Sequence, residues 1–322
     1  MGEFELIERY LSRLGARRDD VVLAVGDDAA LVRPPQGLEL ALAADTVVAG
    51  RHFPDGLSAE DVGYRVLAVN LSDMAAMGAE PAWALLTLTL PSGDERWVRE
   101  FASGLHGLAQ RFGVALVGGD TTSGPLAATV AIGGFVPAGQ ALRRTGARPG
   151  DEIWVSGTPG DAAAGLAVME CRLEGPEAVV GPLLDRFRRP EPRVALGLVL
   201  RGVATACIDV SDGLVADLGK LAAASGVGAA VDSTLLPCSR SLRAAVTPPE
   251  ARRFALAGGD DYELLFALPP GTDAAALGRG AGVGLARIGE FRTGRGVIID
   301  GEPAPRELAA GFDHFASPRP GP

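Results

Sequence analysis

Aspartates recur beside small residues along this chain, and most of them follow a short apolar run. The set comprises Gly26-Asp27-Asp28, Asp45-Thr46, Ser72-Asp73, Gly118-Gly119-Asp120, Asp209-Val210-Ser211-Asp212-Gly213 and Gly258-Gly259-Asp260-Asp261. Each motif alone is typical of a turn or a helix cap, because Asp and Gly are common turn residues. Carboxylates gathered at one edge of a fold, however, would repel one another without cations. Mg²⁺ prefers oxygen ligands and often binds through carboxylates together with substrate phosphates, so the whole set indicates a magnesium–nucleotide site.

The apolar runs before most of these aspartates predict strands, and the pattern is a strand followed by a carboxylate in the turn. In open α/β sheets that edge is where ligands bind. Asp73 is different, because it lies in the middle of the small, apolar stretch "AVNLSDMAAMGA". Burying a lone carboxylate is costly unless it is paired or metal-bound. Asn70 precedes Asp73 by one helical turn and shares its face, so we expect Asp73 to point toward the metals.

The phosphate chemistry is not that of the commonest nucleotide enzymes. The chain has no GxxxxGK[ST] motif and no protein-kinase motif set. Gly118-Gly119 would let backbone N–H groups approach a phosphate. Arg143 and Arg144 are candidate phosphate ligands, and a solvated surface pair is the equally weighted alternative.

No Ser-His-Asp or Cys-His arrangement is suggested, so we expect no covalent or general-base residue. His106 lies on a predicted amphipathic helix and is expected to be structural. His52 lies in the turn "VVAGRHFPDG" and is a candidate ligand contact. A surface position is the ordinary alternative for His52 and for His314.

Composition narrows the possible partners. The 322 residues allow one large domain or two ordinary ones, and the net charge of −10 argues against a nucleic-acid footprint. Three scattered cysteines without a CxxC motif argue against a disulfide framework or a zinc ribbon. There is no apolar run long enough to span a membrane, and the N-terminal stretch lacks the apolar core of a secretion signal. We therefore expect a cytoplasmic protein without nucleic-acid or membrane partners.

The elements that must position these residues follow from periodicity and caps. Helices are predicted over 4–14, 58–77 (Ser58 as N-cap, Gly78 after the end), 94–112, 161–174, 177–188, 192–203 and 212–225. Strands are predicted over 21–25, 38–45, 82–91, 114–118, 127–137, 152–157, 205–210, 262–268, 285–291 and 296–301. The mixture predicts an α/β or α+β class.

The Gly-, Arg- and Pro-bearing stretch after Ala138 divides the chain into domains 1–138 and 139–322. The recurrence of Ser-Asp and Gly-Gly-Asp in both halves leaves a duplication open.

Ten stretches taken together carry a resemblance. They are "GEFELI", "GDDAAL", "DTVVAGRHF", "VNLSDMAAMGAEPAW", "LVGGDTTSGP", "RTGARPGD", "VSGTPGDAAAGL", "IDVSDGLVADL", "AGGDDYEL" and "GFDHF". In order and spacing the chain resembles the thiamine-monophosphate kinase family, within the superfamily of aminoimidazole ribonucleotide synthetase and selenophosphate synthetase. The resemblance implies a two-domain PurM-like fold. The N-terminal domain would bind ATP and Mg²⁺ and pair its sheet with a second copy in a homodimer, and the C-terminal domain would complete the active site.

The resemblance also implies the activity and its residues. The family transfers the γ-phosphoryl group of ATP to thiamine monophosphate, directly and in line, with several Mg²⁺ ions. The matching metal ligands are Asp28, Asp45, Asp73, Asp120, Asp209 and Asp212. Gly119, Asp120, Arg144 and Ser211 match ATP contacts, and His52, Asp260 and Phe312 match substrate contacts. The chain departs from the family at Ala43 and Ala44, where hydroxyl residues are usual, and at Asp260, where Glu is common.

The residues fit this chemistry without the family name. Phosphoryl transfer needs positioning and charge neutralisation more than covalent help. Because the acceptor is itself a phosphate anion, it needs no general base, but bridging cations must offset the repulsion between two anions. Two alternatives remain: another ATP-dependent enzyme of the superfamily, and a non-catalytic binder that kept the fold. Retention of all six aspartates argues against the binder. A first cysteine as late as Cys171 argues against a selenophosphate enzyme.

Overall fold

The computed structural model describes residues 3–309 and 311, and it divides into two compact units. The first unit comprises Met1–Leu142 and Arg188–Gly202, and the second comprises Arg143–Phe187 and Val203–Pro322. The segment 188–202, which lies in the second domain of the sequence-based division, therefore belongs to the first unit. Both units contain helices and strands, so the predicted mixed α/β class is confirmed.

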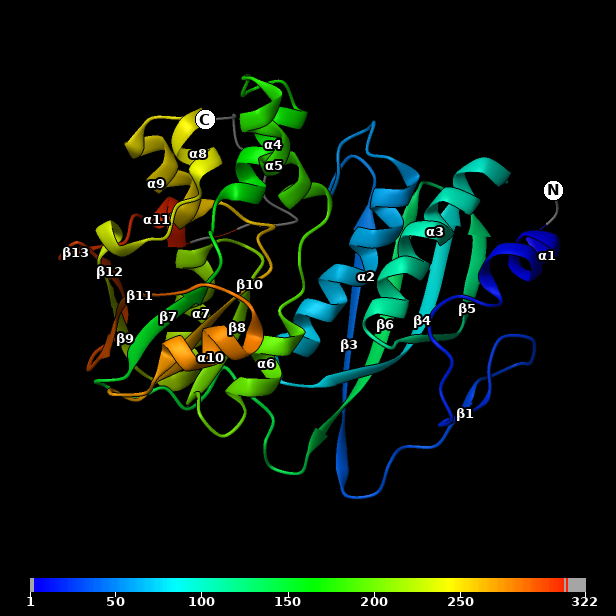
Figure 1. Cartoon of the computed structure of the whole chain (residues 1–322), viewed down its shortest axis with the longest axis horizontal. Helices are drawn as coiled ribbons and strands as arrows, with labels where there is room; N and C mark the ends of the chain where they lie inside the picture. The colour runs from blue at the N-terminus through cyan, green and yellow to red at the C-terminus, as the bar shows by residue number, and fades with distance from the viewer. Residues whose placement is uncertain (1–2, 310, 312–322) are drawn as a thin grey trace. The chain divides into compact units, whose positions relative to one another are not determined.

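The first unit is built on a four-stranded sheet in the order β3-β6-β4-β5. The strands are β3 (Leu38–Val48), β4 (Glu80–Leu90), β5 (Ala115–Ser123) and β6 (Ala127–Pro137). β6 pairs antiparallel with both β3 and β4, whereas β4 and β5 are parallel. Figure 1 shows α2 (Ala59–Ala76) and α3 (Glu95–Arg111) side by side against one face of this sheet. Shorter elements precede it: α1 (Glu3–Leu6), the π-helical turn η1 (Ile7–Leu11), and the paired strands β1 (Val21–Leu23) and β2 (Leu31–Val32).

Helix α2 forms within one residue of its predicted bounds. The Ser58 side chain accepts the backbone N–H of Asp61 at the N-terminus, and Gly78 follows the C-terminus with a φ of 62°. Two caps thus fix both ends of a helix whose sequence is otherwise apolar nearly all round.

The small residues of α2 permit unusually close helix contacts. A Cβ added at Gly63 of α2 would lie 2.0 Å from the carbonyl oxygen of Phe101, and one added at Gly104 of α3 would lie 1.9 Å from that of Glu60. On another side, a Cβ at Gly197 of α6 (Val194–Leu200) would lie 2.1 Å from the carbonyl oxygen of Ala75. Two helices therefore meet the backbone of α2 at glycines.

The other face of this sheet carries exposed leucines. Leu38, Leu40 and Leu42 alternate along β3 with exposures of 39%, 44% and 74%, and Leu85 of β4 is 44% exposed. Their alternation with residues that face the helices follows the period of a strand. A soluble sheet would ordinarily present polar side chains there.

The second unit is built on a seven-stranded sheet in the order β13-β12-β9-β11-β7-β10-β8. The strands are β7 (Glu152–Ser156), β8 (Ala206–Val210), β9 (Gly228–Val231), β10 (Glu263–Leu268), β11 (Leu285–Arg292), β12 (Gly296–Ile299) and β13 (Glu302–Pro303). The helical elements are α4 (Asp161–Met169), α5 (Glu177–Arg188), α7 (Leu214–Ser225), η2 (Ser233–Leu235), α8 (Arg240–Ala245), α9 (Pro248–Ala257), α10 (Ala274–Ala281) and α11 (Arg306–Ala309).

The core of the second unit lies between α7 and its sheet. Leu214, Leu218 and Leu221 of α7 pack in one cluster with Ile208 of β8 and Leu265 of β10. Helix α7 is thereby fixed against β8, the strand that leads into it. Over the described part of the chain, the helices are each too short or too polar to cross a bilayer.

Candidate active site

Asp45 and Asp73 of the first unit come from a strand and a helix that a buried asparagine joins. Asn70 of α2 is fully buried, and its Oδ1 accepts the backbone N–H of Asp45 on β3 at 3.1 Å. Its Nδ2 donates to the carbonyl oxygen of Val66 at 2.8 Å. β3 is an edge strand of its sheet, and Asn70 gives this N–H a buried side-chain acceptor. Asp73 lies one turn further along α2 and is half-buried rather than enclosed in the core.

Asp120 lies within a strand, whereas the sequence pattern predicted a turn. β5 continues through Gly118-Gly119 to Ser123, and Asp120 pairs with Thr87 of β4. Asp45 and Asp209 likewise lie inside β3 and β8. The expectation of a turn was therefore wrong for Asp120, whereas Asp45 and Asp209 fall inside the predicted strands 38–45 and 205–210. The two glycines suggested that the strand ends at Gly118, but pairing with β4 extends it to Ser123.

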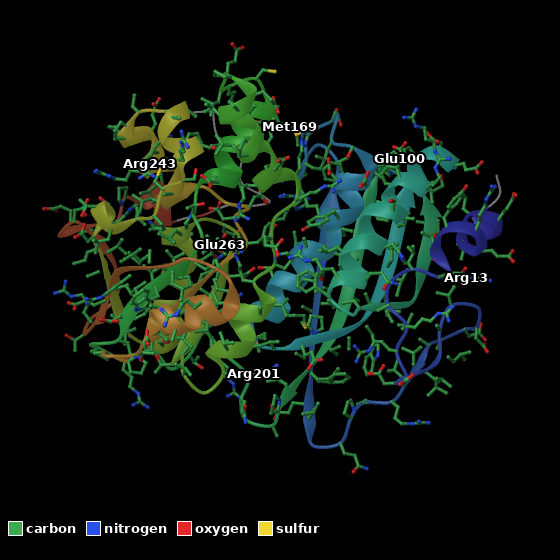
Figure 2. All side chains as sticks on the ribbon, in the orientation of Figure 1. Arg13, Glu100, Met169, Arg201, Arg243 and Glu263 are labelled. Atoms are coloured by element: carbon green, nitrogen blue, oxygen red, sulfur yellow. The ribbon has the colours of Figure 1, made fainter. Side chains whose placement is uncertain are left out.

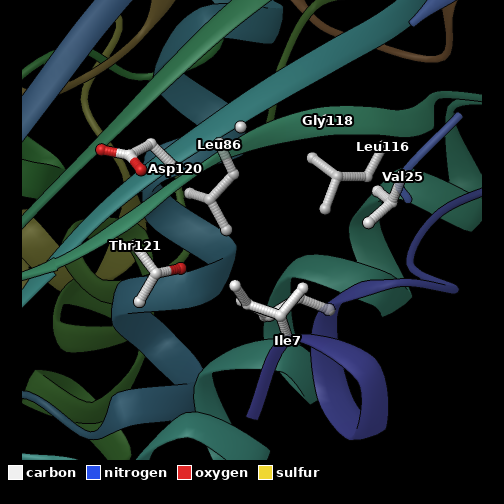
Figure 3. A pocket seen from close by; sticks show the side chains of 9 residues that line it. Ile7, Val25, Leu86, Leu116, Gly118, Asp120 and Thr121 are labelled. Atoms are coloured by element: carbon white, nitrogen blue, oxygen red, sulfur yellow. The ribbon is translucent and has the colours of Figure 1, made fainter. Parts of the chain in front are cut away.

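The glycine before Asp120 is required by close packing. Gly119 has a φ of 147°, and a Cβ there would lie 1.8 Å from the carbonyl oxygen of Leu86. A small cavity of about 50 Å³ lies beside it, lined by apolar side chains that include Ile7 and Leu116. In Figure 3 the Asp120 carboxylate points away from Ile7 and Leu116. The carboxylate is exposed, as a ligand for a soluble cation should be.

Hydroxyl groups share the sheet face of Asp120. The register aligns Thr46, Thr129 and Thr87 with Asp120 across the four strands. The Thr46 and Thr129 hydroxyls lie 2.8 Å apart. Cross-strand partners share a face, so this row offers only oxygen donors. Asp45, next to Thr46 along β3, lies on the opposite, helix-covered face.

The two remaining predicted residues of the first unit lie in loops. Asp28 is exposed between β1 and β2, and its N–H donates to the Asp27 carboxylate at 2.8 Å. His52 follows β3, and its Nδ1 accepts the N–H of Val48 at 3.0 Å. The neutral imidazole must then carry its proton on Nε2. His106 accepts the N–H of Gly15 at 3.2 Å, which matches its expected structural role.

In the second unit, two of the acidic motifs come together. Asp209 is buried on β8, and the turn with Ser211 and Asp212 leads from it into α7. The loop before β10 joins this turn, because Asp260 donates its N–H to the carbonyl oxygen of Ser211 at 2.9 Å. Tyr262 donates in the same way to Val210 at 2.8 Å. The structure thus brings Asp209, Ser211, Asp212 and Asp260 to one end of β8.

The backbone of this loop is strained. Asp260 and Tyr262 have φ values of 67° and 51°, in the left-handed region that non-glycine residues rarely adopt. Strained conformations of this kind persist where the surroundings over-determine them, and they cluster at functional sites. Here the surroundings include Gly259, where a Cβ would lie 2.6 Å from the carbonyl oxygen of Ser211.

Buried carboxylates next to the loop hold it in place. Asp261 is fully buried and accepts the N–H groups of Gly160 and Ala162, at the start of α4, at 2.7 and 3.3 Å. Burial raises the pKa of Asp261 well above its ordinary value, although those two N–H groups act in the opposite direction. Glu263, labelled in Figure 2, is also fully buried and accepts from Arg186 at 2.6 Å.

Asp217 and Lys220 of α7 were not among the predicted site residues. Asp217 is buried and accepts the N–H groups of both Ser211 and Asp212 at 2.9 Å. Lys220 bonds to the carboxylates of Asp217 and Asp212. The signal in the sequence was the one that identified Asp73, a lone aspartate inside an apolar helical run, "GLVADLGK".

The remaining predicted residues are less constrained. Arg144 is exposed, and its backbone oxygen accepts from Ser225 at 2.9 Å. Phe312 lies outside the described residues. Gly311 immediately before it is described, and a Cβ there would lie 3.3 Å from the Cβ of Asp212. Cys207 is buried, and burial raises the pKa of its thiol, which agrees with an inert cysteine.

The donors fit hard cations. Carboxylate and hydroxyl oxygens are the ligands Mg²⁺ prefers. One of these carboxylates, Asp212, already forms an ion pair with the Lys220 ammonium. Across residues 3–309 and 311, no three His, Cys, Asp or Glu side chains are grouped as a metal centre.

Two family models and a curated protein match the sequence of this chain. Residues 26–136 match the family model "AIR synthase related protein, N-terminal domain", and residues 148–301 match "AIR synthase related protein, C-terminal domain". The chain is 48% identical to thiamine-monophosphate kinase of Escherichia coli (strain K12), over 98% of this chain and 99% of that one.

Solved structures agree with these matches. Thiamine-monophosphate kinase from Stenotrophomonas maltophilia K279a superposes with a TM-score of 0.86 at 48% identity, over 89% of this chain and 93% of that one. AaThiL complexed with AMPPCP and TMP superposes with a TM-score of 0.79 at 30% identity, over 98% and 97% of the two chains. The predicted PurM-like fold is confirmed by these matches.

Proposed function

The chain belongs to the thiamine-monophosphate kinase family, and from that premise we propose how its residues carry out the reaction. The activity is the ATP-dependent phosphorylation of thiamine monophosphate. The observation that carries the proposal is that buried polar side chains hold the backbone of an aspartate in each unit: Asn70 accepts the N–H of Asp45, and Asp217 accepts that of Asp212.

We assign six carboxylates as ligands for several Mg²⁺ ions. They are Asp28, Asp45, Asp73 and Asp120 of the first unit and Asp209 and Asp212 of the second. When bound, the ions neutralise charge on the phosphates and so allow two anions to approach. Ala43 and Ala44 leave fewer side-chain hydroxyls beside Asp45 than the family usually has.

The chain's other residues bind and orient the two substrates for direct, in-line transfer. Gly119 brings a backbone close to the nucleotide phosphates, and Arg144 and Ser211 contribute a guanidinium and a hydroxyl to them. His52 holds Nε2–H toward thiamine monophosphate, because Nδ1 already accepts from Val48. Asp260 and Phe312 complete the substrate contacts. The left-handed backbone at Asp260 fixes the direction of its shorter carboxylate arm.

The enzyme is proposed to act as a homodimer in the cytoplasm. The exposed leucines on the open face of the first unit's sheet support pairing with a second copy, because contiguous apolar surface of this kind marks interaction sites. A second copy of the same sheet offers the same leucines, which suits an isologous interface.

The experiment that tests the metal assignment uses ATP, Mg²⁺ and thiamine monophosphate, with thiamine diphosphate separated by chromatography. We expect no turnover in EDTA and recovery with Mg²⁺. Asp73→Asn keeps the shape but removes a ligand charge, so turnover should fall by about 10²-fold, on the scale of losing one electrostatic stabiliser. Full turnover without metal, or an Asp73→Asn variant within about threefold of wild type, would overturn the assignment.

A further inference from the structure

Lys220 is the single lysine of the chain, and it sits on a proposed metal ligand. Its ammonium bonds to the Asp212 carboxylate and, at 2.7 Å, to Oδ1 of Asp217. The Lys220 and Asp212 side chains are 42% and 32% exposed, so solvent and ions reach this pair. Asp217 is only 1% exposed.

The two carboxylate oxygens of Asp217 accept hydrogen bonds from different groups, one from the turn before α7 and the other from Lys220. Its Oδ2 accepts the N–H groups of Ser211 and Asp212, each at 2.9 Å, and its Oδ1 accepts from Lys220. Lys220 follows Asp217 by three residues on α7, a spacing that places the two side chains on one face. One buried carboxylate therefore fixes both the backbone before α7 and the ammonium on Asp212.

We propose that Lys220 is a positioning residue for metal capture: it is an internal counter-ion that keeps the Asp212 carboxylate oriented, and an incoming metal ion displaces it. The inference rests on the proposed role of Asp212 as a metal ligand. An ammonium and a divalent cation on one carboxylate repel each other, so metal binding at Asp212 favours release of the ammonium from it. Asp217 remains as the partner of the displaced ammonium, since it is buried and cannot turn away.

The first experiment uses the unmodified full chain. Because the chain has one lysine, protein grown with ¹³Cε-lysine gives a single side-chain NMR signal, from Lys220. Addition of Mg²⁺, at a concentration that gives full turnover in the same buffer, should shift and narrow this signal toward that of a more mobile lysine. An unchanged signal overturns the inference. The turnover of the same sample reports the proposed function separately.

The second experiment measures Mn²⁺ affinity from the free-ion signal in electron paramagnetic resonance. Lys220→Gln should bind Mn²⁺ about 3- to 5-fold more tightly, the range that a partly exposed charge pair contributes. Lys220→Arg keeps the charge and should stay near wild type. Arg172→Gln, which removes an equal charge that pairs with Glu170 instead, is the matched control and should not change affinity. Unchanged or weaker binding by Lys220→Gln would refute displacement.

A third variant tests the role of Asp217. Asp217→Asn removes the charge that anchors the ammonium but keeps the side chain's size. In the labelled Asp217→Asn protein without metal, the ammonium keeps only Asp212 as a partner, so the Lys220 signal should be narrower than that of metal-free wild type. A signal identical to that of metal-free wild type would show that Asp217 does not hold the ammonium.

Discussion

At the scale of single residues, Asn70 connects the stability of the first unit to its proposed metal ligands. Asn70→Ala should leave the Asp45 N–H without its partner, at a cost of about 1–3 kcal/mol in the free energy of unfolding. It should also raise the Mg²⁺ concentration needed for half-maximal turnover, because the Asp45 backbone is no longer held. Urea unfolding and turnover against Mg²⁺ concentration measure the two effects.

The matched control for Asn70 is its buried apolar neighbour. Val69→Ala removes packing from the same helix without touching Asp45, so it should lower stability with an unchanged Mg²⁺ requirement. If Asn70→Ala and Val69→Ala behave alike toward Mg²⁺, then Asn70 is purely structural.

Asp261 makes stability depend on pH in an unusual direction for a carboxylate. Burial raises its pKa in the folded protein, so the unfolded chain ionises first as the pH rises from about 4. The contribution of Asp261 to stability is therefore present at low pH and is lost as the pH rises through the folded-state pKa. Buried Asp161 and Asp217 shift in the same direction, each mainly because of burial.

Asp261→Asn tests this pH dependence, because an amide cannot ionise. Between about pH 4.5 and 7.5, the free energy of unfolding in urea should fall less steeply for the variant than for wild type. Asp185→Asn, on the exposed side of α5, removes a charge without removing a buried carboxyl and serves as the control. Parallel profiles for wild type and Asp261→Asn would contradict the assignment.

At the scale of elements, the crossing of α2 and α3 depends on reciprocal glycines. Gly104→Ala would place a Cβ 1.9 Å from the carbonyl oxygen of Glu60, so the helices must separate. We expect a loss of about 1–3 kcal/mol or more in the free energy of unfolding. Gly107→Ala, one turn along α3, meets nothing within 4 Å and should instead stabilise the helix by up to about 1 kcal/mol. Equal effects in urea unfolding would show that the crossing tolerates a methyl group.

The elements that the sequence predicts best are those with local end signals. Helices α2 and α3 form within a residue of their predicted bounds, because Ser58 and Asp94 cap them through their own side chains. Strand β5 was predicted to end at Gly118, but pairing with β4 carries it to Ser123. That outcome depends on a partner strand far away in the sequence, which local turn signals cannot report.

The residues of the candidate site also divide into those that have a local signal in the sequence and those that do not. The aspartates were predicted from their repeated pattern and the family resemblance, and buried side chains hold the backbone of Asp45 and of Asp212. The left-handed backbone of Asp260 and Tyr262 could not be predicted, because non-glycine residues give no local sign of it. Lys220 could not be assigned a partner either, since its contact with Asp212 arises from the turn that Asp217 fixes.

At the scale of the whole molecule, the open sheet face makes the oligomeric state testable. Leu42 is 74% exposed on β3, and Leu42→Lys places a charge in the proposed contact between two copies. Wild type should have the mass of a dimer by light scattering at micromolar concentration, and the variant that of a monomer. Leu235→Lys makes the same change at a leucine of the second unit that is 49% exposed, and should leave the mass unchanged. A monomeric wild type would reject the dimer.

The return of the chain to the first unit through α6 sets an order of events during synthesis. Gly197 must reach the backbone of Ala75, but the ribosome makes all of 143–187 before it makes α6. At ordinary translation speeds those roughly 45 intervening residues take about 2–9 s. Throughout that interval the nascent α2 displays an uncovered apolar side to the cell. The first unit is thus begun early but finished late, and its unfinished surface is where a chaperone would first meet this protein.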